Sequence, residues 1–147
     1  MILQKLPLVK QWINMILTTH AAYARPILDY GFQEIPKYFS QETLASAKVV
    51  VVEKVPMPPL SQIGLSQLGD FEKGDYLGVT YLDTYFLLAQ EARNESTHFH
   101  ELCHIVQWKY LGLDKFLVAY AVGLLQHGYR NSPLEVMAYE YQQLFED

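Results

Sequence analysis

We expect the fold to be organised around one stretch, residues 94–112, NESTHFHELCHIVQWKYLG. From Asn94 onward its apolar side chains repeat at i, i+3, i+4 and i+7, which is the period of a helix. The repeating residues are Phe99, Leu102, Cys103, Val106 and Tyr110. Gly112 can close this helix, because glycine tolerates the backbone conformation that ends many helices. We expect the helix to lie at the centre of the protein.

Helices are also expected on both sides of this stretch. Leu113 to about Gln126 continues as an apolar helix, and Pro133 opens a last one. The packed stripe of that last helix is predicted from its period to be Leu134, Met137, Ala138, Tyr141 and Leu144. Near the N-terminus, helical spacing predicts a helix from about residue 7 to 24, which begins at Pro7 and stops before Pro26.

The residues between the first and central helices contain the strand signals. Residues 27–39 show no clear period, and Ser40 can cap a short helix through Ala45. The β-branched run 49–52 predicts a strand that ends before three prolines. Residues 76–81 and 85–89 favour β structure and predict a hairpin. We therefore expect an α+β fold with a small, twisted antiparallel sheet, whose edge strand the sequence leaves open.

Length and composition restrict the classes of protein. The 147 residues suit a single domain, 50% are hydrophobic, and the net charge is -5 without a cluster of cations, so no nucleic-acid partner is expected. The single cysteine gives no disulfide framework. The longest apolar run, Phe116 to Leu125, is about half of the roughly 20 residues of a membrane helix. We expect a cytoplasmic protein with neither a membrane segment nor a cleaved signal peptide.

The central helix also carries the motif H-E-x-x-H at residues 100–104. Residues four apart share one face of a helix, so His100 and His104 can converge on one metal ion. Glu101 lies one position along and points beside the metal, where a carboxylate can take the proton of an attacking water. This arrangement predicts a zinc site that hydrolyses amides.

The motif resembles that of the zincin metallopeptidases, and specifically the small gluzincins. In that family the third zinc ligand is a glutamate on a later helix, usually in the pattern Glu-x-x-Ala followed by Asp. The resemblance implies Glu135 as the ligand and Ala138 as the small residue, while Tyr139 departs from the pattern, so Tyr139 or Glu140 is expected to support the first histidine. Residues 78–142 also resemble a group of compact bacterial gluzincin-like proteins. The implied fold is a zincin-like single domain over residues 1–147, with the small sheet and the N- and C-terminal helices packed on the metal-binding helix.

Two other third ligands stay open at this point. Glu140 lies on the same expected helix as Glu135, and His127-Gly128 resembles the third-ligand segment of SprT-like proteases. The metzincin pattern is excluded, because it needs glycine and histidine where this chain has Gln107 and Tyr110.

Several residues near the motif have weaker signals. Tyr129 and Arg130 are candidate catalytic donors to the oxyanion, or else an exposed turn pair. His98 is expected at the surface or near the helix start, His20 as a hydrogen-bonded histidine, and Cys103 as small core filling.

These signals together predict a zinc-dependent metallopeptidase that acts on a peptide or protein substrate with Glu101 as general base. The alternatives are a non-hydrolytic zinc-binding protein with the zincin fold, in which zinc only holds the helices together, and an SprT-like protease with His127 as third ligand. The oligomeric state and the substrate stay open.

Overall fold

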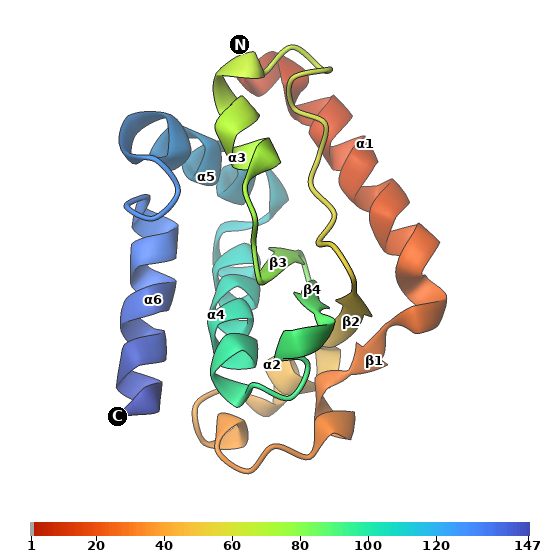
Figure 1. Ribbon diagram of the computed structural model, residues 1–147, viewed down its shortest axis with the longest axis vertical. Coiled ribbons are helices and arrows are strands. Elements are labelled where there is room, and N and C mark those ends of the chain that lie inside the picture. Colours follow the sequence, from red (N-terminus) through yellow and green to blue (C-terminus); the bar gives the residue numbers. More distant parts are fainter. Residues whose placement is uncertain (1) are drawn as a thin grey trace.

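The computed structural model describes residues 2–147 as a mixed α+β fold, with a small sheet surrounded by helices (Figure 1). Short 3-10 turns join several of the elements. The helices and strands are α1 (Ile2–His20), β1 (Arg25–Pro26), α2 (Gln41–Ser46), β2 (Lys48–Val52), α3 (Gly69–Lys73), β3 (Gly78–Tyr81), β4 (Thr84–Leu88), α4 (Glu95–Leu111), α5 (Leu113–His127) and α6 (Pro133–Glu146).

The sheet has four strands in the order β1-β2-β4-β3. The predicted strand at 49–52 and the predicted hairpin are confirmed as β2 and as β3 with β4. The expectation of an antiparallel sheet is wrong, because β2 and β4 pair in parallel, whereas the β1–β2 and β3–β4 pairs are antiparallel. Residues 53–77 carry the chain past the position of β4 to β3, and the β3–β4 hairpin then brings it back beside β2, so the whole connection 53–83 allows the parallel pairing. β3 is therefore an edge strand.

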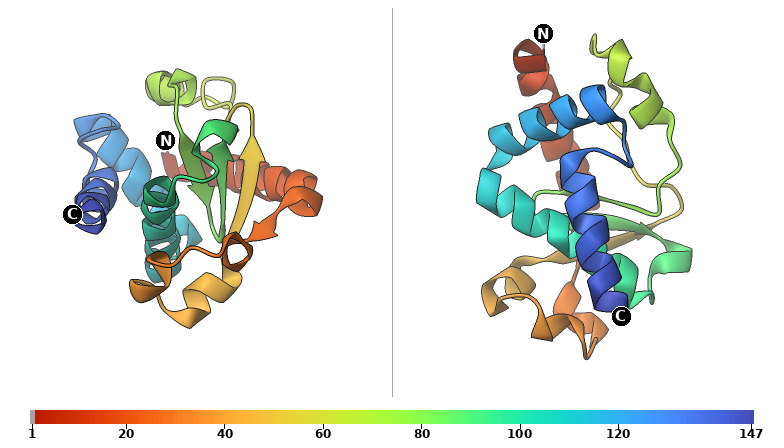
Figure 2. Two further views of the ribbon diagram at one scale, coloured as in Figure 1. Left: turned by 60° about the horizontal axis from the view of Figure 1, so that its bottom comes forward. Right: turned by 90° about the vertical axis from the view of Figure 1, so that its left-hand side faces the viewer.

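Helices cover both faces of this sheet, with α1 on one side and α4 on the other (Figure 2). Alternate strand residues therefore enter two separate apolar clusters, as the period of two in a strand requires. Phe86 packs in the cluster that contains Val9 and Ile13 of α1. Tyr85 packs in the cluster that contains Leu102 of α4. Beyond α4, α6 forms a further layer (Figure 2).

The central helix α4 ends where the sequence predicts, with Gly112 at a φ of 83°. Its first half is buried on all sides from Thr97 to Ile105, because the sheet and α6 enclose it. The predicted apolar stripe is correct only over this half. Val106 is 42% exposed and Tyr110 is 88% exposed, whereas Gln107 and Trp108 are buried, so the second half of α4 is covered on one side only.

The last helix turns inward a face that matches the predicted stripe only in part, since Ala138 is buried and Leu134 packs against the core as predicted. Met137, Tyr141 and Leu144 are exposed, which contradicts the stripe expected from their apolar period. The buried residues of α6 are Glu135 and Ala138. Ala138 has no exposed surface, and its small side chain allows α6 to approach α4 closely. The inward face of α6 is therefore partly polar, and this brings functional side chains against α4.

The N-terminal helix begins earlier than predicted. It contains Pro7 as an interior residue, although proline removes one backbone hydrogen bond there. The preceding turn is retained because Ile2 packs against the apolar core, so burial offsets the lost bond. The predicted helix cap at Ser40 is confirmed, since its side chain accepts from the Thr43 amide. Within residues 2–147, none of the helices combines the length and the apolar character needed to cross a membrane.

Candidate metal centre

Three buried side chains meet between α4 and α6. Nε2 of His100 lies 3.1 Å from Oε1 of Glu135, and Nε2 of His104 lies 3.1 Å from Oε2 of the same carboxylate. Ligand atoms from all three residues lie within 4.8 Å of one another. Two ligands of one tetrahedral metal ion with bonds of about 2.0–2.2 Å are themselves about 3.3 Å apart. The cluster is therefore geometrically able to hold a metal ion.

The start of α6 is positioned by a close approach to α5. A Cβ atom on Gly123 of α5 would lie 3.0 Å from Cδ of Pro133 and 3.3 Å from Cβ of Ser132. Glycine at this position thus allows the first turn of α6 to pack directly on α5. Pro133 is the first residue of α6, so Glu135 enters the site from its first turn.

The proton on the His104 ring is fixed by a glutamine. Nδ1 of His104 lies 2.7 Å from Oε1 of Gln107, whose Nε2 donates to the backbone carbonyl of Leu134 at 3.0 Å. A carbonyl only accepts, so the amide orientation of Gln107 is determined and its Oε1 must accept from Nδ1. In the neutral ring, Nε2 of His104 then presents a lone pair to Glu135.

A second glutamine fixes the proton of His100 in the same way. Nδ1 of His100 lies 2.9 Å from Oε1 of Gln142, and Nε2 of Gln142 donates to the Ser96 hydroxyl at 2.9 Å. That hydroxyl in turn donates to the carboxylate of Glu146, so it must accept from Gln142. Nε2 of a neutral His100 therefore also presents a lone pair to Glu135.

With both rings neutral, the centre gathers acceptor atoms that have no donor between them. Nε2 of His104 is fully buried and makes no hydrogen bond, because its approach to Glu135 is not aligned for one. Burial lowers the pKa of His104, but Glu135 outweighs this effect and raises the pKa to about 9. Burial also works against the charge on Glu135, yet the two imidazoles hold its pKa well below the ordinary value. Without a metal, a proton on His104 therefore supplies the positive charge beside Glu135 at neutral pH. A divalent cation that replaces this proton would be held by two neutral histidines and one carboxylate that all face one point.

The hydroxyl of Tyr120 on α5 donates to Oε2 of Glu135. This contact fixes the carboxylate from the side away from His100. No sequence motif points to Tyr120, because the pattern around it predicts only an apolar helix. Gln107 and Gln142 were also missed as supporting residues, although Gln107 lies one helical turn after His104.

Glu101 lies beside the cluster and is 5% exposed. Its Oε1 accepts from the Thr80 hydroxyl on β3 at 2.7 Å. Burial raises the pKa of Glu101, against the opposing effect of His100, His104 and Thr80. A Cβ atom on Gly78 would lie 3.0 Å from Oε2 of Glu101, so glycine at this position of the edge strand makes room for the carboxylate.

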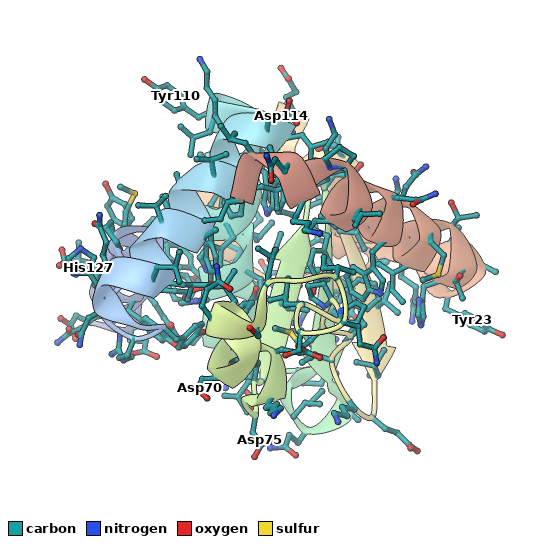
Figure 3. All side chains as sticks on the ribbon, turned by 90° about the horizontal axis from the view of Figure 1, so that it is seen from above. Tyr23, Asp70, Asp75, Tyr110, Asp114 and His127 are labelled. Carbon is teal, nitrogen blue, oxygen red and sulfur yellow. The ribbon has the colours of Figure 1, made fainter. Side chains whose placement is uncertain are left out.

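The other ligand candidates lie outside the cluster. His127 ends α5 and is exposed, at the outer edge of the molecule (Figure 3). Glu140 is exposed on α6. The structure therefore brings Glu135, and neither of these two residues, to the paired histidines. Tyr139 lies against the His100 ring with 4.3 Å between ring centroids, whereas Gln142 makes the hydrogen bond that was expected from Tyr139 or Glu140.

The two candidate oxyanion donors lie at different distances from the metal centre. The Tyr129 ring lines the cavity beside the centre, and its hydroxyl lies 3.2 Å from that of Tyr139. Arg130 is exposed, and its guanidinium stacks over the Tyr139 ring at 3.6 Å from the centroid. Tyr129 is thus close to the metal centre, whereas Arg130 is connected to the centre only through Tyr139.

The remaining histidines and the cysteine have structural contacts. His98 is fully buried, so the surface position expected for it is wrong, although it does lie in the first turn of α4. Its ring bonds to the Tyr85 hydroxyl at 2.6 Å and to the Ala92 carbonyl at 2.8 Å. Nδ1 of His20 bonds to the Ile16 carbonyl, and Cys103 is packed in the core, both as expected.

Comparison of the chain with protein-family models, with curated proteins and with solved structures finds no match. The chemistry of the centre therefore rests on its own geometry.

Proposed function

We propose that this protein is a zinc-dependent metallopeptidase that hydrolyses peptide bonds with Glu101 as general base. The observation that carries the proposal is the orphaned, buried Nε2 of His104, which faces the Glu135 carboxylate in a cluster that also contains His100. Nitrogen and oxygen donors in a His, His, Glu set are typical of catalytic zinc sites, which have three protein ligands.

The residues around the centre have distinct roles in this proposal. Zinc bound by His100, His104 and Glu135 would supply Lewis acidity and a water whose pKa falls toward 7. Glu101, placed beside the ligands by its bond to Thr80, takes the proton from the attacking water and passes it to the leaving amine. The raised pKa of Glu101 suits this transfer, because a base works best when its pKa is near the working pH. Tyr129 is the candidate donor to the developing oxyanion, and Arg130 supports it through Tyr139.

The second candidate is a metal site that holds α4 and α6 together without turnover. Burial favours it, because His100, His104, Glu101 and Glu135 are all 5% exposed or less. A large substrate needs more access than this to reach the metal. Glu101 argues against a structural metal site, because such a zinc site has four protein ligands and needs no additional carboxylate beside them.

One substitution separates the two candidates. Glu101→Gln removes the base but keeps the side-chain size and the acceptor for Thr80, so zinc binding and folding should persist while cleavage falls by at least about a hundredfold. His104→Ala should lose the metal as well. Glu140→Gln is the matched control, because this exposed glutamate lies outside the cluster.

The assay is cleavage of a mixed peptide library by zinc-loaded protein, read by mass spectrometry, with zinc content measured for each variant. Equal cleavage by wild type and Glu101→Gln contradicts the proposed mechanism. A zinc-loaded wild type that cleaves nothing in the library favours the structural site.

A further inference from the structure

A long apolar cavity adjoins the metal centre. Its wall includes Ile2, Leu6, Val9 and Ile13 of α1, which lie at intervals of four, three and four residues and so form one face of that helix. At a rise of about 1.5 Å per residue, this face extends for about 16 Å. An apolar wall of that length is greater than the reach of any single apolar amino-acid side chain.

A second part of the lining leads to the metal centre. It is formed by α5, from Phe116 through Ala121 to Leu124, and by the edge strand β3. Glu101, His104 and Glu135 line the same cavity, so it opens directly onto the proposed reacting atoms. Seen from above, α1, α5 and α3 surround this region of packed side chains (Figure 3).

The lining offers no charged partner away from the centre. Among the lining residues that the structure describes, Glu101, His104 and Glu135 are the only acidic or basic side chains. The tyrosine hydroxyls already have partners within the protein: that of Tyr76 donates to the Phe71 carbonyl and that of Tyr81 to the Pro56 carbonyl. The hydroxyls of Tyr120 and Tyr129 are engaged by Glu135 and Tyr139. A charged or strongly polar guest would lose its hydration there without compensation.

We propose that this cavity binds a straight apolar chain of the substrate, such as the acyl group of an acylated peptide, and so presents the adjoining amide to the metal centre. The presentation step rests on the proposed peptidase function, whereas binding of the chain does not. The length of the α1 wall favours a chain over a single side chain, and the satisfied hydroxyls favour hydrocarbon over any polar group.

Chain binding is tested on zinc-loaded Glu101→Gln protein, which should keep the fold without cleaving the ligand. Uncharged N-acyl glycinamides of two to twelve carbons displace a fluorescent apolar probe. Each additional buried methylene should tighten binding by about fourfold, and the gain should continue beyond six carbons. Ala121→Phe should abolish this gain, because Ala121 lines the cavity. Ala119→Phe is the matched control on the same helix, because Ala119 is exposed.

Circular dichroism and melting curves check that the variants fold, and Ala121→Leu provides a smaller obstruction if Ala121→Phe does not fold. A gain that stops by four carbons, the size of a leucine side chain, overturns the proposal. Equal chain-length dependence in Ala121→Phe and Ala119→Phe overturns it too.

A second arm separates this inference from the proposed function. Zinc-loaded protein is given one peptide sequence with acyl chains of the same lengths, and kcat/KM should rise in the order of the binding series. Tight binding of long chains without any cleavage supports the cavity assignment and contradicts the peptidase. Cleavage that is independent of chain length contradicts the cavity assignment and supports the peptidase.

Discussion

Replacing Gln107 by leucine tests whether the outer hydrogen bonds prepare the metal centre. In the wild type, Gln107 accepts from Nδ1 of His104 and donates to the Leu134 carbonyl, which joins α4 to the start of α6. Leucine has a similar size but makes neither bond. His104 is then free to place its proton on Nε2, and in that tautomer the ring cannot bind a metal through the nitrogen that faces Glu135.

Two effects of this substitution can be given magnitudes. Loss of a hydrogen-bond partner of a ligating histidine weakens metal binding by about 10- to 100-fold, which corresponds to about 1.4–2.8 kcal/mol. The stability of the zinc-free protein should also fall by about 1–3 kcal/mol, because Nδ1 of His104 and the Leu134 carbonyl stay buried without partners. Because zinc binds the variant more weakly, the stabilisation that a given zinc concentration provides should be smaller than in the wild type.

Zinc affinity is measured by competition with a chromogenic chelator, and stability by urea unfolding with and without zinc. The control is Gln143→Leu, since Gln143 is exposed on α6. A Gln107→Leu protein that unfolds like wild type and binds zinc within twofold of it would refute the argument that Gln107 selects the tautomer. Gln107→Glu should retain much of the affinity, because a carboxylate still accepts from Nδ1.

Three further predictions concern the whole fold. Chelation of zinc should lower the melting temperature by about 8–16 °C at a zinc concentration a thousand times Kd, because about 4 kcal/mol of binding free energy is lost, and an unchanged melting temperature after confirmed metal loss would contradict the site. Gly78→Ala places a Cβ atom 2.7 Å from Cδ2 of Leu87 and 3.0 Å from Oε2 of Glu101, so stability should fall by about 1–3 kcal/mol and cleavage should fall with zinc retained. Full activity of this variant would show that the carboxylate does not need that space. His98→Ala should destabilise the protein by about 2–4 kcal/mol without loss of zinc stoichiometry, and loss of the metal from a folded variant would make His98 part of the centre.

Local signals in the sequence predict most of the elements well. The helix that carries the motif, the helix that Pro133 opens and the hairpin are all predicted close to their observed bounds. These elements depend on short-range features, namely spacing, caps and breakers. The direction of pairing between β2 and β4 is not local, because it depends on residues 53–77 placing β3 on the outer side of β4 and not beside β2.

The inward faces of the helices are harder to predict, and the reason is visible on α6. Hydropathy selects Met137, Tyr141 and Leu144, yet these residues are exposed. The face that meets α4 carries Glu135, Tyr139 and Gln142, at the spacing i, i+4 and i+7. A polar stripe at helical spacing is usually a solvated face. Here it is turned inward because His100 and His104 supply partners for it on α4.

The polar stripe also connects the metal centre to the packing of α6. Without a cation or a proton, the lone pairs of His100 and His104 face the carboxylate of Glu135 with nothing between them, which opposes close packing of the two helices. The hydrogen bonds of Gln107 and Gln142 keep those lone pairs pointing inward, so they strengthen a bound metal and also increase the cost of its absence. We therefore expect the position of α6 against α4 to depend on occupancy of the centre. The same hydrogen bonds that orient the histidines toward a metal would make a bound metal part of the fold.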